Sequence, residues 1–132
     1  SGAVNVEQID SGQYGDIVGT RRVLRDSSAY ADFWAALHAD RDSLPERPSV
    51  DFATEVVVAV VMGERPTGGY TVTVDDALAD PQGGGIQVRF TETMPGDECE
   101  VTQAMTSPYV LATVAAQSED ITFAGSEETR TC

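Results

Sequence analysis

Lysine is absent from this chain, and histidine, tryptophan and cysteine are scarce. The 132 residues hold one histidine, one tryptophan, two cysteines and eight basic side chains, all arginine, against 22 acidic ones, for a formal net charge of −14. An acidic excess of this size repels nucleic acid and anionic lipid headgroups, so it argues against both classes of partner. The acidic excess together with the absence of lysine also predicts a source adapted to high salt, where carboxylates stay solvated and salt screens their mutual repulsion.

Long apolar runs are missing as well. No stretch approaches the roughly 18 consecutive apolar residues that span a bilayer, and no basic-then-apolar leader precedes Val4. With 41% hydrophobic residues, the chain can bury one core but is too short for two ordinary domains. We therefore expect one mature, soluble domain over residues 1–132.

The sequence offers little for catalysis. It contains no Gly-x-Ser-x-Gly elbow, and its one histidine, His38, follows Leu37 near the expected end of a helix. Such a histidine is more often solvated or capping than a general base. Cys99 stands among acidic residues, which disfavour a thiolate nucleophile. We expect no catalytic residue and no enzyme activity.

Metal and cofactor sites are also not expected. One histidine and two cysteines match no zinc spacing, and the carboxylates at 75–80 and 97–98 lack the alternation of a calcium-binding EF-hand loop, so a solvated surface is the favoured interpretation. The glycine-rich segment at 66–69 precedes a strand pattern rather than a helix and has no lysine nearby, which argues against phosphate binding.

The two cysteines leave two interpretations open. Cys99 and Cys132 fit one disulfide that closes a loop of about 30 residues, worth roughly 3–4 kcal/mol in the chain-entropy model. A disulfide would indicate an oxidising compartment. Two free thiols fit the sequence equally well.

One helix is expected early in the chain. Four apolar residues recur at i, i+3, i+4 and i+7, after Ser27 or Ser28 as the N-cap. They are Tyr30, Phe33, Trp34 and Leu37. We expect the helix to end near Asp40, before the prolines at 45 and 48.

The remaining pattern predicts strands. They are expected at Val4–Ile9, Arg22–Leu24, Val56–Met62, Tyr70–Val74, Ile86–Thr91, Val101–Met105, Val110–Val114 and Ile121–Phe123. The run at 56–62 is apolar on both alternating faces, which is typical of a central strand covered on two sides. We predict an α+β, mainly β fold: an antiparallel sandwich or barrel-like sheet with one packed N-terminal amphipathic helix.

The most informative motif is the octapeptide Gly63–Tyr70, a proline- and glycine-containing loop that follows the central strand. It predicts a rigid turn that presents polar side chains, and a second proline-containing turn follows at Thr106–Tyr109. The predicted partner-binding residues are Arg65, Pro66, Thr67, Gly68, Gly69, Tyr70, Ser107, Pro108 and Tyr109. The alternative is that the octapeptide is only a hairpin connection and that Tyr70 and Tyr109 cap the core.

These motifs carry a family resemblance. Val50-Asp51-Phe52, the apolar strand, Gly63–Tyr70, Pro95-Gly96, Val101–Ala104 and Thr106–Tyr109, in this order, resemble the C-terminal domain of the PrcB family over residues 20–125. The family is named for a cell-envelope lipoprotein that associates with and stabilises a secreted subtilisin-like protease complex. The resemblance implies a cell-envelope or secreted location, a lipid anchor before the mature domain and a protease partner.

A weaker likeness is to chagasin-type protease inhibitors, which insert three loops of a β-sandwich into a protease cleft. The segments 66–69, 83–85 and 107–109 follow the same order, with Ser107 where the third motif has arginine.

From these observations we expect a non-catalytic extracytoplasmic module that binds a protein partner. The alternative is a structural or small-ligand-binding domain of the cell envelope. An enzyme would require His38 and Cys99 to be adjacent.

Overall fold

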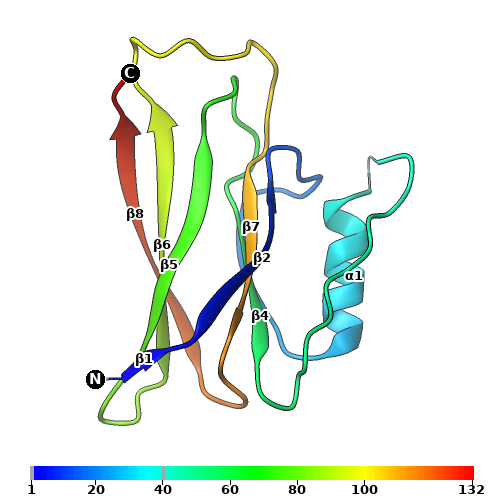
Figure 1. Cartoon of the computed structure of the whole chain (residues 1–132), viewed down its shortest axis with the longest axis vertical. Helices are drawn as coiled ribbons and strands as arrows, with labels where there is room; N and C mark the ends of the chain where they lie inside the picture. Colours follow the sequence, from blue (N-terminus) through cyan, green and yellow to red (C-terminus); the bar gives the residue numbers. More distant parts are fainter. Residues whose placement is uncertain (1, 40) are drawn as a thin grey trace.

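The chain folds as two four-stranded sheets packed face to face, with α1 against the outer face of one of them (Figure 1). The structure is a computed structural model that describes residues 2–39 and 41–132. The elements are β1 (Gly2–Val4), β2 (Val6–Gly12), β3 (Thr20–Leu24), α1 (Ser27–Leu37), β4 (Val56–Val61), β5 (Thr71–Ala79), β6 (Ile86–Pro95), β7 (Tyr109–Val114) and β8 (Ile121–Arg130). One sheet has the order β1-β5-β6-β8 and the other β2-β7-β4-β3, which confirms the predicted mainly β sandwich.

The central strand β4 has the double burial that its apolar run predicts. Val57, Ala59 and Val61 pack against α1, whereas Val56 and Val58 face the other sheet. Because successive side chains of a strand point to opposite faces, a strand that is covered on both faces has to be apolar throughout. The helix therefore covers one side of β4, as expected.

The N-cap of helix α1 lies one residue before the first of the two predicted cap positions. The carboxylate of Asp26 accepts a hydrogen bond from the Ala29 amide at 2.8 Å, so Asp26, and not Ser27 or Ser28, is the N-cap. Asp and Ser are comparable N-caps, and the chain carries them at the consecutive positions 26 to 28. The helix ends at Leu37 with His38 as its C-cap. The predicted end near Asp40 lies outside the described residues.

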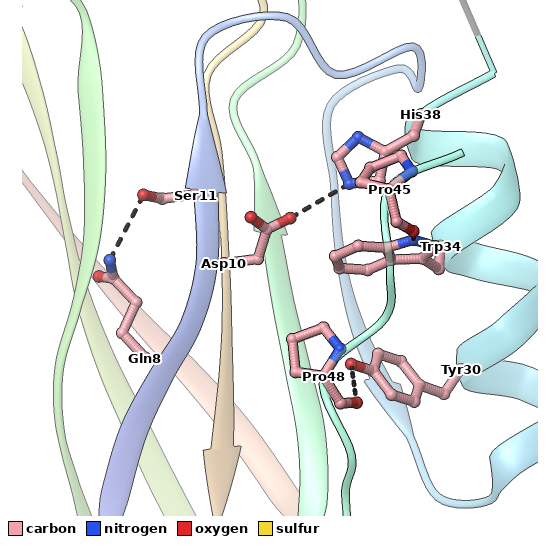
Figure 2. Close-up of polar contacts among 8 residues, drawn as sticks. All are labelled: Gln8, Asp10, Ser11, Tyr30, Trp34, His38, Pro45 and Pro48. Atoms are coloured by element: carbon pink, nitrogen blue, oxygen red, sulfur yellow. Dashed lines mark hydrogen bonds and ion pairs between the residues drawn. The ribbon is translucent and has the colours of Figure 1, made fainter. Parts of the chain in front are cut away.

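Three rings on one face of α1 tie the helix to the rest of the molecule (Figure 2). The Tyr30 hydroxyl and the Trp34 indole N–H donate to the carbonyl oxygens of Pro48 and Pro45, each at 2.9 Å. Nε2 of His38 lies 3.1 Å from Oδ2 of Asp10 on β2. The proline-containing connector thus runs along the helix, and the Tyr30 hydroxyl and the Trp34 indole N–H have partners although both rings are buried.

Parts of the predicted strand pattern and pairing were wrong. Residues 101–105 form no strand but an irregular segment, because they cross from β6 in one sheet to β7 in the other. The sandwich is also not wholly antiparallel, since β8 pairs with β6 in parallel along its whole length. The chain visits β7 in the opposite sheet between these two strands, so it enters β8 from the same end as β6.

Three connections lie together at one end of the sandwich, at the top of Figure 1. We call this the loop end and define it as residues 13–19, 62–70 and 96–108. No helix within residues 2–39 and 41–132 is long and apolar enough to cross a membrane.

Candidate functional site

The octapeptide is not a hairpin connection. It leads from β4 in one sheet to β5 in the other, so it crosses the end of the sandwich. Gly63 and Gly69 have φ values of +85° and +92°, which confirms the use of glycine for backbone that other residues adopt at a cost. Gly63 also lies so close to the 13–19 segment that a Cβ atom there would be 2.9 Å from the amide nitrogen of Gly19.

The two predicted loops lie side by side. The amide of Arg65 donates to the carbonyl of Thr106 at 2.7 Å, and the amide of Thr106 donates to the carbonyl of Arg65 at 2.9 Å. The Thr106 hydroxyl adds a bond of 2.8 Å to the carbonyl of Thr67. The loops therefore form one backbone-paired unit rather than two independent tips.

Not all nine predicted contact residues reach solvent. Pro66 is exposed, and Arg65, Thr67, Gly69, Tyr70 and Ser107 are partly exposed, whereas Gly68, Pro108 and Tyr109 are buried. Gly68 is covered because its amide bonds to the carbonyl of Thr102 at 3.0 Å, which places the irregular 101–105 segment over it. The predicted surface is thus reduced to its exposed members.

Tyr109 is the main correction to the predicted site. It is only 1% exposed and packs with α1 on the helix-covered face of its sheet, because the odd-numbered residues of β7 point to that face. Its ring centroid lies 5.6 Å from that of His38. Burial raises the pKa of the Tyr109 phenol to about 12, and the neighbouring Asp10 carboxylate contributes. Tyr109 caps the core, which was the alternative interpretation, and it is not a contact aromatic.

Tyr70 keeps its place at the surface. It is partly exposed, the guanidinium carbon of Arg65 lies 5.8 Å from its ring centroid, and its carbonyl accepts from the Gln13 side chain at 3.0 Å. The two predicted tyrosines therefore differ in role.

A third segment, residues 13–19, completes the loop end, and the sequence interpretation missed it. The Ser107 amide donates to the carbonyl of Gln13 at 2.7 Å, and the Gly15 amide donates to the carbonyl of Ser107 at 2.9 Å. The segment is also held to the helix, since the Asp16 amide bonds to the carbonyl of Leu37 at 2.9 Å. An available signal was the apolar pair Ile17-Val18, which stands among glycines outside any strand or helix pattern.

Exposed apolar side chains gather at this end. Of the five large hydrophobic residues that the described chain exposes, Tyr14 at 55%, Val18 at 82% and Met105 at 57% line one groove with a volume of about 450 Å³. Met94, on β6, lines a neighbouring cleft of about 220 Å³ together with Arg65 and Tyr70. Only Leu44 lies away from these two hollows. Single exposed hydrophobics are ordinary, but a group of them around a groove is typical of an interaction site.

The residues weighed for catalysis do not assemble a site. Cys99 is bonded to Cys132, so its sulfur is not a free nucleophile. His38 is 2% exposed between Trp34 and Tyr109, which corrects the expectation of a solvated histidine, although it does occupy the C-cap. Its one hydrogen-bonded side-chain partner in the described chain is Asp10, which fixes the ring against β2.

Asp75 and Asp76, two of the carboxylates weighed for calcium, already have partners. Asp75 accepts hydrogen bonds from the hydroxyls of Thr73 and Thr91, and Asp76 forms an ion pair with Arg89 across β5 and β6. The Arg89 guanidinium holds the pKa of Asp76 below its usual value. Within the described residues, no three His, Cys, Asp or Glu side chains are grouped so that they could hold a metal ion.

The disulfide joins the end of β8 to the loop end. The Cα atoms of Cys99 and Cys132 are 5.2 Å apart, within the usual range for a bridge. Next to it, the Gly96 amide donates to the carbonyl of Arg130 at 2.9 Å. The bridge therefore fixes the start of the 96–108 connection, and it is typical of proteins from oxidising compartments.

Comparison with known families bears on the segment that contains β4 and both predicted loops. Residues 56–115 match the family model PrcB C-terminal. This confirms the resemblance over a shorter span than the expected 20–125. No curated protein and no solved structure matches the chain. The PrcB C-terminal match contains Glu64, Met105 and Ser107 of the groove, whereas the 13–19 wall lies outside it.

Proposed function

We propose that this chain is a non-catalytic, extracytoplasmic protein-binding module that associates with a secreted protease and stabilises or modulates it. The observation that carries the proposal is the concentration of exposed apolar side chains on a loop end whose backbone is already paired. Preorganised loops lose little conformational entropy on docking, so a surface of this kind is suited to a protein partner. The PrcB C-terminal match supports the choice of a protease, because the family is named for a protease-associated protein and is not known to be catalytic.

The contact residues of this proposal differ in part from those that the sequence predicted. Arg65, Pro66 and Tyr70 remain, with Thr67, Gly69 and Ser107 beside them, and Tyr14, Val18 and Met105 join as apolar anchors. Aromatic, Met and Arg side chains are enriched at protein interfaces, where they contribute most of the affinity. Gly68, Pro108 and Tyr109 shape the surface from beneath.

The proposed location is the cell envelope or the secreted fraction, with a lipid anchor before the domain. The disulfide supports an oxidising compartment. We further propose that the acidic surface is adapted to high salt. The melting temperature should then rise between low and molar sodium chloride, and a melting temperature that stays constant or falls would contradict this part of the proposal.

The function is tested by affinity capture from the secreted fraction of the source organism with the disulfide-intact domain as bait. A secreted protease should be captured, and a Val18→Ser, Met105→Ser double variant should lose it. Leu44→Ser is the matched control, because Leu44 is 54% exposed but lies outside the loop end. Equal capture by wild type and the double variant would refute the site, and capture of a non-protease alone would refute the partner class.

A further inference from the structure

The groove at the loop end has two distinct walls. Tyr14 to Gly19 form one wall and Met105 to Ser107 the other, with Glu64 between them. Its volume of about 450 Å³ falls within the ~300–1,000 Å³ range of pockets that take a small molecule, which is room for a few side chains. The groove is therefore suited to a short segment of chain.

The walls are fixed in position before any partner arrives. The Ser107 backbone bonds to the carbonyl of Gln13 and to the amide of Gly15, and a Cβ atom on Gly15 would lie 2.9 Å from the Leu37 side chain. The 13–19 wall is thus clamped between β7 and α1. Tyr14 and Val18 of this wall remain exposed, whereas Ile17 packs against the core beside α1.

The charge of the groove has one sign. Asp16 and Glu64 are its only ionisable lining residues apart from the Tyr14 phenol, and both are exposed. Neither belongs to one of the two ion pairs found in the described chain. The remaining wall is Tyr14, Ile17, Val18 and Met105 with small or hydroxyl-bearing residues. The chain as a whole carries a net charge of −14, so the two carboxylates of the groove belong to a molecule that already attracts cations.

We propose that this groove binds a short basic and apolar segment of the partner protein, with its apolar side chains against Tyr14, Val18 and Met105 and a Lys or Arg beside Asp16 and Glu64. The inference rests on the proposed function and adds the chemistry of the segment that is recognised. Charge complementarity selects against acidic segments, which would face two uncompensated carboxylates. The long stems of Lys and Arg can cover apolar wall while their charged heads remain in water.

The chain carries its own reporters for a test. Of its three methionines, Met105 lines the groove, whereas Met94 and the buried Met62 line the neighbouring cleft. The whole disulfide-bonded chain, labelled with ¹³C at the methionine methyl groups, is titrated with a synthetic seven-residue peptide of alternating Leu and Lys. Two further peptides carry Glu in place of Lys, or Ser in place of Leu.

The Leu–Lys peptide should shift the Met105 methyl signal and leave Met94 and Met62 unchanged. The Leu–Glu and Ser–Lys peptides should bind at least about five-fold more weakly, since each loses one class of contact. An Asp16→Asn, Glu64→Gln variant should bind the Leu–Lys peptide about five-fold more weakly. The matched control is Asp42→Asn with Glu46→Gln, which changes the net charge by the same amount on the connector after α1. Its affinity for the Leu–Lys peptide should stay close to that of the wild type.

Equal affinity for the Leu–Lys and Leu–Glu peptides, or shifts confined to Met94, would overturn the inference. Equal weakening by the two charge variants would also overturn it, because attraction would then come from net charge and not from the groove. A failure of this inference can be distinguished from a failure of the proposed protease-binding function. Protease capture that depends on Val18 and Met105 without any preference for basic peptides would leave the function standing and remove this inference alone.

Discussion

The helix-covered face and the loop end of this molecule both carry apolar side chains, but they use them in opposite ways. Leu37 of α1 and Tyr109 beneath the helix are buried, whereas Val18 and Met105 at the loop end are exposed to water. Met105 and Tyr109 are only four residues apart, so the change from one use to the other takes place within a single turn of chain. Backbone pairing explains how this is possible: the loops are held by main-chain hydrogen bonds and need not bury their side chains to stay ordered.

The largest effect is expected on the helix-covered face. Tyr109→Ala should lower the free energy of unfolding by about 3–5 kcal/mol, because it leaves a cavity among fully buried neighbours. Tyr70→Ala, at the partly exposed loop end, should cost much less. Urea denaturation of both variants checks this contrast, with Tyr109→Phe as the control that keeps the ring. Equal losses for Tyr70→Ala and Tyr109→Ala would show that the two regions share one core.

The disulfide should give the next largest effect. Cys99→Ser with Cys132→Ser opens a loop with a sequence separation of 33 and should lower the free energy of unfolding by about 3–4 kcal/mol. Because the bridge lies at the loop end, hydrogen exchange should increase first at residues 96–104 and not under α1. Uniform loss of protection through both regions would contradict the separation drawn between them.

Alkaline pH should act on the helix-covered face in particular. Burial raises the pKa of Tyr30 and of Tyr109 from 10.0 to about 12. In the unfolded chain both phenols lose their protons near pH 10, while the folded protein holds them until about pH 12. The stabilisation is therefore complete below pH 10 and is lost as the pH rises from 10 towards 12.

Urea denaturation between pH 9 and pH 12 measures this loss. The Tyr30→Phe, Tyr109→Phe variant is the control, and its stability should depend less steeply on pH in that window. A wild-type curve with the same slope as the double variant would mean that neither phenol is protected from water.

The smallest effect on stability is expected at the groove. Val18→Ser with Met105→Ser should change the free energy of unfolding by no more than about 0.5 kcal/mol, because both side chains are already exposed. Thermal unfolding by circular dichroism measures it. A loss above about 2 kcal/mol would assign these residues to the core and would remove the comparison between the two regions.

Several features could be predicted from the sequence because their signals are local. The spacing of Tyr30, Phe33, Trp34 and Leu37 fixes the buried face of α1, since a helix repeats every 3.6 residues. The uninterrupted apolar run of β4 identifies a strand covered on both faces. Gly63 and Gly69 mark positive φ values in the octapeptide. Each of these signals is read within one element.

Other features depended on contacts between distant residues. The parallel pairing of β8 with β6 follows from the path through the opposite sheet, which no local pattern records. The burial of Tyr109 depends on which face of β7 the helix covers. The 13–19 wall is held in place by hydrogen bonds from Gln13 and Gly15 to Ser107, which lies more than 90 positions later in the chain.

By itself the sequence determined the buried face of α1, the central strand β4, the mainly β class, the acidic charge and the identity of the two proline- and glycine-containing loops. These follow from propensity, periodicity and charge, which are properties of neighbouring residues. Only the tertiary structure decided that Tyr109 turns inward, that Tyr14, Val18 and Met105 share one groove, and that Asp16 and Glu64 stand beside them. The physical reason is that exposure depends on what the other sheet, the helix and the crossing loops place over each side chain.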